Sequence, residues 1–265
     1  MIRKSVIFLV MILGAYFINS ALAADTMPVL PKYQFVPSNS VLQDINEKRN
    51  AAILKNKRLL VVFGAQWCHD SRSLSQRFST PKINAILQQQ YETVFVDVGY
   101  LSTGFEAIEQ LDQAIYYGTP TVLIIEPKTN SLLNQSSIMH WTNADSLDIA
   151  EYSDYFSQDF ALPLEEETGD PVLLAYLEEI RHFERIQAAR LYLAYQIIEP
   201  LLKSYEETDI GSTDEFGNIW GEVKIYRTAI PSDIAKLIEE AKSKSKESDK
   251  TALTFPQYPA FSWEE

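Results

Sequence analysis

The chain has 265 residues, of which 46% are hydrophobic and 22% charged, with only 9 glycines and 12 prolines. This composition is typical of a globular protein and excludes collagen-like, low-complexity and largely disordered chains. A formal net charge of −13 argues against a protein that binds the nucleic-acid backbone, because such a protein needs a basic face. The single cysteine and three histidines exclude an internal disulfide and the common cysteine-rich zinc sites.

The N-terminus has the three parts of a secretory signal peptide. Arg3 and Lys4 precede an apolar run over residues 6–18, and the stretch Ala21–Ala23 supplies the small residues of a cleavage site. The apolar run is shorter than the roughly 20 residues that span a bilayer. We therefore expect residues 1–23 to be removed on export, with an uncleaved N-terminal anchor as the alternative.

Residues 24–40 contain three prolines and predict an extended lead-in. The domain expected to follow, over residues 41–164, alternates between helical and strand patterns. Helices are predicted over 41–56, 68–78, 81–90 and 105–117 and from 143, and strands over 59–63, 93–98, 121–125 and 132–136. The order βα, βα, ββα predicts an α/β fold, with a mixed sheet covered by helices.

The composition changes after residue 164, and residues 165–265 predict a mainly helical extension. Residues 165–169 are a polar linker, and Asp170 followed by Pro171 is typical of a helix N-cap and first helical position. This extension carries most of the negative charge of the chain. Such a balance favours a solvated helical cover over a cation-binding surface.

A long helix is the first element expected within the extension. Apolar residues from Leu173 to Tyr205 keep to one broad stripe, and Pro200 predicts a kink or a break. The remainder predicts a loop over 209–221, a short strand over 222–227 and a helix over 232–242.

Cys68 is the chemically informative residue, because a buried strand ends shortly before it and a helix is expected to begin at it. The helix dipole and the unpaired backbone N–H groups at a helix N-terminus both favour the thiolate, which is the nucleophile in cysteine chemistry. We therefore expect an exposed, reactive thiol rather than a packing residue. His69 would add positive charge when protonated, although a solvent-exposed bystander is an equal alternative. Ser71 is close enough to donate a hydrogen bond to the sulfur but cannot form a disulfide with it.

Residues 41–160 resemble the thioredoxin superfamily. The segment Trp67–Ser71 matches the motif W-C-x-x-[CS], Pro120 matches the cis-proline that faces the sulfur, and the strand ending at Asp97 matches in position. The resemblance implies a catalytic group of Cys68, His69 and Ser71 and a substrate-binding group of Trp67, Thr119 and Pro120. Within the superfamily the chain is similar to exported bacterial thioredoxin-like proteins, which implies a periplasmic location.

Two departures from the family pattern limit the chemistry. Ser71 replaces the second, resolving cysteine, and Val62 occupies the position of the buried acid that normally helps to deprotonate it. These changes put ordinary dithiol reductase chemistry out of reach. Two functions stay open. One is a monothiol thiol–disulfide oxidoreductase or isomerase, in which Cys68 forms a mixed disulfide that another thiol releases. The other is a non-catalytic thioredoxin-fold module that binds polypeptide along the Pro120 loop.

The partners expected from these two functions are protein thiols, protein disulfides or extended polypeptide. We expect no nucleic-acid partner and no stable membrane insertion after cleavage of the signal peptide. Neither a cofactor nor a metal ion is expected.

Overall fold

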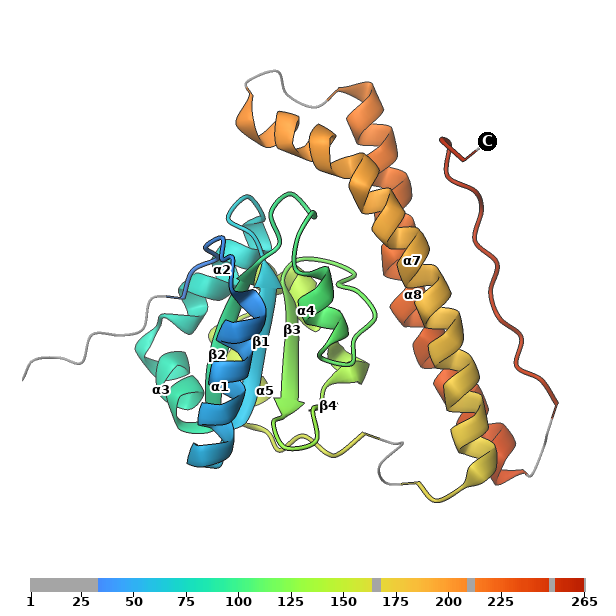
Figure 1. The fold of residues 1–265 in the computed structure, drawn as a ribbon, viewed down its shortest axis with the longest axis horizontal. Coiled ribbons are helices and arrows are strands. Elements are labelled where there is room, and N and C mark those ends of the chain that lie inside the picture. The colour runs from blue at the N-terminus through green and yellow to red at the C-terminus, as the bar shows by residue number, and fades with distance from the viewer. Residues whose placement is uncertain (1–32, 164–167, 209–212, 248–250, 265) are drawn as a thin grey trace, which may run out of the picture.

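The computed structural model describes residues 33–163, 168–208, 213–247 and 251–264. The predicted signal peptide and the start of the lead-in lie outside these ranges. The described chain forms an α/β part and, beside it, a long helical hairpin (Figure 1). Within these ranges, none of the helices combines the length and the apolar character that a membrane span requires.

A four-stranded mixed sheet in the order β2-β1-β3-β4 is the centre of the α/β part. The central strand β1 pairs in parallel with β2 and antiparallel with β3, which in turn pairs antiparallel with β4. All the residues of β1 after Arg58 are buried, as expected of a strand covered on both faces. The strands are β1 (Arg58–Gly64), β2 (Tyr91–Asp97), β3 (Thr121–Glu126) and β4 (Ser131–Leu132). The mixed α/β sheet is therefore confirmed.

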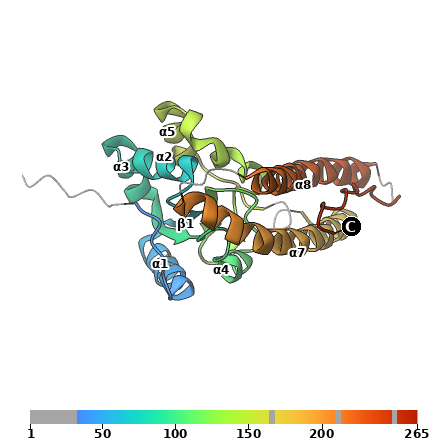
Figure 2. The ribbon, with the colours of Figure 1, turned by 90° about the horizontal axis from the view of Figure 1, so that it is seen from above.

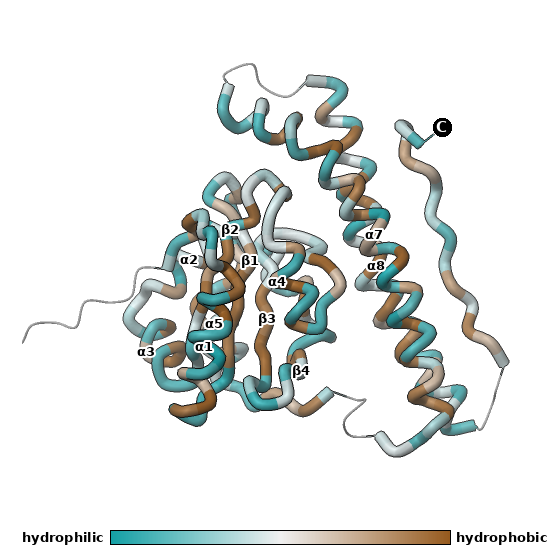
Figure 3. Tube along the Cα trace, viewed as in Figure 1, coloured by the Kyte–Doolittle hydropathy of each residue, from teal (hydrophilic) through white to brown (hydrophobic). Residues whose placement is uncertain are grey.

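Helices cover both faces of this sheet, because successive side chains of β1 point to opposite sides. Val61 and Phe63 face the side of α1 and α4, whereas Leu60 and Val62 face the side of α2, α3 and α5. Figure 2 shows these two groups of helices on opposite sides of the strands, and Figure 3 shows the apolar strands between them. The helices are α1 (Val41–Lys55), α2 (His69–Phe78), α3 (Pro81–Gln90), α4 (Phe105–Glu109) and α5 (Ile149–Ser157).

The end of the lead-in belongs to the core. Tyr33 and Phe35 are buried, and both rings contact Phe95 of β2. The Tyr33 ring also meets the edge of Phe78 at the end of α2. The two aromatic side chains of this segment close the α2 and α3 side of the sheet.

Two long helices, α7 (Pro171–Glu207) and α8 (Asp214–Lys246), pack along each other as a hairpin (Figure 1). The side chain of Asp170 accepts a hydrogen bond from the Val172 N–H, which confirms the predicted cap with Pro171 in the first turn. The C-terminal part of α7, which contains Pro200, bends away from the rest of the helix. Proline removes a backbone donor and clashes with the preceding turn, which explains such a bend.

The sequence predicts a loop over 209–221 and a strand over 222–227. The loop is wrong from Asp214 onward and the strand is wrong throughout, since α8 begins at Asp214 and continues through both stretches. Residues 209–212 of the predicted loop lie outside the described residues. Val223, Tyr226 and Ile230 are buried at helical spacing. The burial comes from packing against α7, and this long-range contact outweighs the weak local preference of a short segment.

Two other predicted elements are shorter than expected. The predicted 105–117 helix stops at Glu109, because Asp112 adopts a left-handed conformation that an α-helix does not contain. The predicted strand over 132–136 is wrong beyond Leu132. The side chain of Asn134 accepts from the Ile124 N–H and donates to the Val122 carbonyl, so it replaces the backbone pairing to β3.

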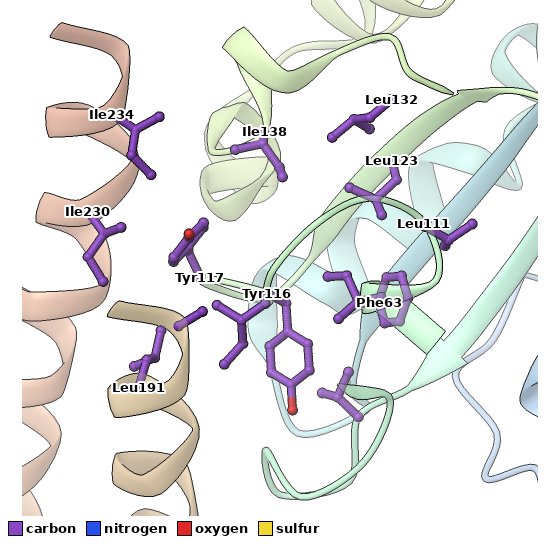
Figure 4. Packing of buried hydrophobic residues seen from close by; sticks show 14 of the residues in the cluster. Phe63, Leu111, Tyr116, Tyr117, Leu123, Leu132, Ile138, Leu191, Ile230 and Ile234 are labelled. Atoms are coloured by element: carbon purple, nitrogen blue, oxygen red, sulfur yellow. The ribbon is translucent and has the colours of Figure 1, made fainter. Parts of the chain in front are cut away.

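The hairpin packs on the α/β part through a stack of aromatic rings. Phe105 stacks on Tyr116 and Tyr116 stacks on Tyr195 of α7, with centroid separations of 5.1 and 5.5 Å. The Tyr195 hydroxyl donates to the Tyr116 carbonyl at 2.9 Å. Figure 4 shows Tyr116 and Tyr117 between Phe63 and Leu123 of the sheet and Leu191 and Ile230 of the hairpin. One continuous apolar core therefore joins the sheet to the extension.

The C-terminal segment 251–264 runs along the hairpin (Figure 1). Phe255 contacts Phe183 of α7, and Phe261 contacts Tyr226 of α8. Arg190 lies over the Phe261 ring and pairs with Glu264 at 2.6 Å. The segment thus ties the two helices together.

Candidate active site around Cys68

Cys68 is the N-cap of α2, directly after the loop that follows β1. Its backbone is extended, its carbonyl accepts the Arg72 N–H at 3.1 Å, and its own N–H donates to the Ala65 carbonyl at 3.2 Å. The side chain is half-buried and forms no disulfide. The thiol therefore lies at the positive end of a ten-residue helix, where a negative charge on sulfur is stabilised.

The structure brings Cys68 and Thr119 together from positions 51 residues apart. The Cys68 thiol donates to the Thr119 carbonyl, with Sγ 3.2 Å from the oxygen. The peptide bond between Thr119 and Pro120 is cis, and both residues are buried. This carbonyl stabilises the protonated thiol, so ionisation of Cys68 would free the oxygen to accept another donor.

Ser71 supports the loop that precedes the cysteine. Its side chain is fully buried, and its hydroxyl accepts the Ala65 N–H at 3.4 Å. No hydrogen bond joins this hydroxyl to the Cys68 sulfur among the described residues. Ser71 therefore stabilises the loop backbone at Ala65, whereas the sequence suggested that its hydroxyl would donate to the thiol.

His69 points toward the segment before α5. Its side chain is 65% exposed, and Nε2 lies 3.7 Å from Asp145 Oδ1 in the 3₁₀ segment η2 (His140–Ser146). Asp145 is itself held by Asp70, which accepts its backbone N–H, and by the Ser73 hydroxyl. An exposed pair of this kind contributes little attraction. In the described part of the chain, no hydrogen bond joins the His69 ring to the Cys68 sulfur.

Trp67 is held in place by the loop after β2. Its indole N–H donates to the Gly99 carbonyl at 2.7 Å, and the Gly99 N–H donates to Asp97 at 2.6 Å. Gly99 has φ of +55°, and a side chain there would meet the Ser102 hydroxyl at 2.8 Å. The end of β2 thus positions the aromatic ring next to Cys68.

Arg72 stabilises the site, although the sequence analysis did not single it out. Its guanidinium donates to the carbonyls of Gln66 and Trp67, each at 2.7 Å. These bonds hold the two residues before Cys68 in one conformation. A basic residue four positions after the cysteine was visible in the sequence, but its contact with these carbonyls depends on the shape of the loop.

Sequence reasoning also missed Trp220, which the hairpin brings to the site. Its ring meets Trp67 edge to face, with centroids 6.4 Å apart. Phe216 and Arg227 pack on Trp220 from the same helix. Near this contact, the Tyr100 hydroxyl donates to Glu207 at the end of α7 at 3.0 Å. The apolar stripe of α8 includes Trp220, but nothing local indicates which surface it contacts.

Below the site the core is apolar. Val62, at the position of the family's buried acid, is fully buried beside Leu60 and Phe35. Across the described part of the chain, no group of three or more His, Cys, Asp or Glu side chains could hold a metal ion.

Comparisons with known proteins give a family model and a solved structure to which this chain is similar. Residues 40–127 match a family model described as thioredoxin-like. One similar solved structure is the crystal structure of a disulphide isomerase from Xylella fastidiosa Temecula1, which is 23% identical. That match covers 46% of this chain and 93% of the other, with a TM-score of 0.44. No curated protein matches the sequence significantly.

Proposed function

We propose that this member of the thioredoxin superfamily, whose thioredoxin-like domain includes residues 40–127, catalyses monothiol thiol–disulfide exchange on polypeptides outside the cytoplasm. A thioredoxin-like domain supports a role in thiol–disulfide chemistry in general. The observation that carries the single-cysteine mechanism is the position of Cys68, at the N-cap of α2 and 3.2 Å from the Thr119 carbonyl. Export rests on the signal-peptide pattern of residues 1–23.

The exchange begins when the Cys68 thiolate attacks one sulfur of a substrate disulfide. A new S–S bond joins Cys68 to the substrate, and the other substrate sulfur leaves as a thiolate and takes up a proton. A second thiolate then attacks the mixed disulfide and restores Cys68. If that thiolate belongs to the substrate, the disulfide is isomerised; if it belongs to an external thiol, the substrate is reduced. Ser71 cannot perform this step, so the mixed disulfide waits for another thiol.

The surroundings of the thiol suit an extended polypeptide. Once Cys68 is ionised, the Thr119 carbonyl is free to accept a backbone N–H of a bound strand. Trp67 and Trp220 offer an aromatic surface beside it. Aromatic surfaces of this kind bind apolar side chains with little loss of conformational entropy.

The decisive experiment combines alkylation and trapping. Iodoacetamide should modify Cys68 in the folded protein, because its side chain is only half-buried. A model protein with mispaired disulfides should accumulate as an adduct on non-reducing gels. Cys68→Ala should abolish the adduct and leave stability nearly unchanged. Ordinary reactivity with no adduct would instead support the non-catalytic binding module.

Ser71→Cys provides the matched gain-of-function variant. An added thiol one helical turn from Cys68 should compete for the mixed disulfide, shorten its lifetime and give weak dithiol reductase activity. The activity should stay weak because Val62 supplies no base for the new thiol.

Export needs a separate measurement. Intact mass of the protein from its native host should correspond to a chain that begins after residue 23. Retained Met1 in cytosolic material would overturn this part of the proposal.

A further inference from the structure

We propose that a cavity between the thioredoxin-like domain and the helical hairpin binds an amphipathic organic cation, meaning an ammonium group attached to an apolar body. The cavity has a volume of about 1130 Å³. Its walls come from residues 109–117, from the segment around β4, and from α7 and α8. This site is separate from the Cys68 thiol, which does not line it.

Glu184 supplies the anionic group in this wall. It lies in the middle of α7, is 7% exposed, and accepts hydrogen bonds from the Tyr117 hydroxyl at 2.6 Å and the Gln113 amide at 3.3 Å. Both donors are neutral. Among the described residues no lysine, arginine or histidine forms an ion pair with Glu184. A carboxylate in such a place lacks the counter-charge that buried ions normally have.

The basic groups nearest to the cavity already contact other acids. Arg181 pairs with Glu178 at 2.9 Å, and Lys242 pairs with Glu239 at 2.7 Å. Arg185, the neighbour of Glu184 in sequence, also pairs with Glu178. None of these three basic groups forms an ion pair with Glu184, although Arg185 acts on it electrostatically at longer range. The carboxylate can therefore still pair directly with a ligand cation.

Gln113 provides a second acceptor in the same wall. Its amide N–H groups donate to Glu184 and to the Ile115 carbonyl, which fixes the orientation of the amide. The amide oxygen Oε1 is buried and has no hydrogen-bond partner in the part of the chain described. An ammonium carries three donors and no acceptor, so it matches a carboxylate and an amide oxygen on one wall.

The rest of the cavity is suited to an apolar body. Figure 4 shows Leu132, Ile138 and Ile234 on the domain and hairpin sides of Tyr117. Leu177, Ile180 and Ile238 also line the cavity. Pockets with many apolar residues and a few polar groups at fixed positions are typical of small-molecule sites. A fully polar cation would make no favourable contact with this apolar lining, so the ligand should also have an apolar part.

Burial raises the pKa of Glu184 above its ordinary value, and the hydrogen bonds from Tyr117 and Gln113 act in the opposite direction. A bound ammonium would favour the ionised form of the carboxyl. Burial thus disfavours the ionised form of Glu184, and a bound cation would counteract this effect.

Tryptamine and tryptophol test the proposal, because they share an indole body. Tryptamine carries an ammonium group where tryptophol carries a hydroxyl. Calorimetric titration at neutral pH and moderate salt should show tryptamine binding about tenfold more tightly than tryptophol to the full chain. Glu184→Gln should bring the two affinities close together. An amide oxygen still accepts from Tyr117 and Gln113, so this variant removes the charge and keeps the network.

The matched control is Glu109→Gln, at an exposed position on the rim of the cavity. It should leave the preference for tryptamine unchanged. If both variants lost the preference for tryptamine equally, the preference would reflect general attraction of cations to an acidic protein, and the proposal would be overturned. Equal affinities of the wild type for the two probes, or no binding of either probe, would also overturn it. Ile138→Trp, which fills part of the cavity and leaves the carboxylate in place, should weaken both probes; unchanged binding would also overturn the proposal.

Discussion

Gly64, the last residue of β1, has no room for a side chain. A Cβ at this position would lie 2.6 Å from the Phe35 ring and 2.6 Å from the Ser71 hydroxyl. Both neighbours are buried. The lead-in and the start of the active-site helix therefore meet at one glycine, three residues before Trp67.

We expect Gly64→Ala to lower the free energy of unfolding by about 1–3 kcal/mol, because Phe35 or Ser71 must move to make room. Urea denaturation measures this difference. Gly221→Ala is the matched control, since a side chain at this position in α8 meets nothing within 4 Å. It should stabilise the protein by about 0.5–1 kcal/mol through higher helix propensity. A neutral Gly64→Ala would contradict the tight contact.

The sequence predicts single residues well where the signal is local. Cys68 at a helix N-terminus follows from the apolar strand before it and the motif around it. The contacts of Ser71 and Arg72 could not be predicted in this way. Each depends on where the backbone of residues 65–67 lies in space, and that path is set by packing on both sides of the loop.

Among the elements, α8 has the greatest influence on the surroundings of the thiol. It carries Trp220 to the edge of Trp67, and the Phe216 ring lies behind Trp220. One wall beside the candidate site is therefore built by the extension. Removing that wall should change access to the sulfur and leave the α2 N-terminus intact.

Trp220→Ala should raise the rate at which a bulky maleimide modifies Cys68 severalfold. It should also lower the free energy of unfolding by about 1–3 kcal/mol, through lost aromatic packing. Stopped-flow labelling and urea denaturation measure the two effects. Ile225→Ala, a change at a position of α8 that is 73% exposed, should alter stability by less than about 0.5 kcal/mol and leave the labelling rate unchanged. An identical labelling rate in both variants would mean that Trp220 does not limit access.

Elements could be predicted from the sequence where their signals are strong and local. The cap at Asp170 and the buried run of β1 both led to correct predictions. Residues 222–227 led to a wrong one, because the buried positions of α8 become clear only when α7 is placed against them. The strand beyond Leu132 failed for a different reason, since a side chain of Asn134 takes the place of backbone pairing.

At the scale of the whole molecule, the sequence predicts a boundary between domain and extension after residue 164, but it does not predict how the two parts contact each other. The linker at 165–169 was visible as a change in composition. The stack of Phe105, Tyr116 and Tyr195 joins residues far apart in the chain, and no periodic pattern relates them. Aromatic residues in two separate amphipathic segments do not specify which will meet.

The pH dependence of folding should report on Glu184 at this contact. Burial raises its pKa in the folded chain, so the folded state binds the proton more tightly than the unfolded state does. The stabilisation from this proton is complete below the unfolded value of about 4.3 and is lost as the pH rises through the folded value. Glu184→Gln, which does not titrate, should therefore gain stability relative to the wild type between about pH 4.5 and neutral pH. Urea midpoints of both proteins across this range measure the effect, and a constant difference would contradict it.

The contact between Tyr116 and Tyr195 can form only late in the synthesis of the chain. The two residues are 79 positions apart, and chains are synthesised at about 5–20 residues per second. The ribosome therefore needs roughly 4–16 s to add Tyr195 after Tyr116. Until then the thioredoxin-like domain has the aromatic face that α7 later covers. The extension thus covers this face only after the domain has been synthesised. A chain that stops before α7 should therefore aggregate or stay bound to chaperones.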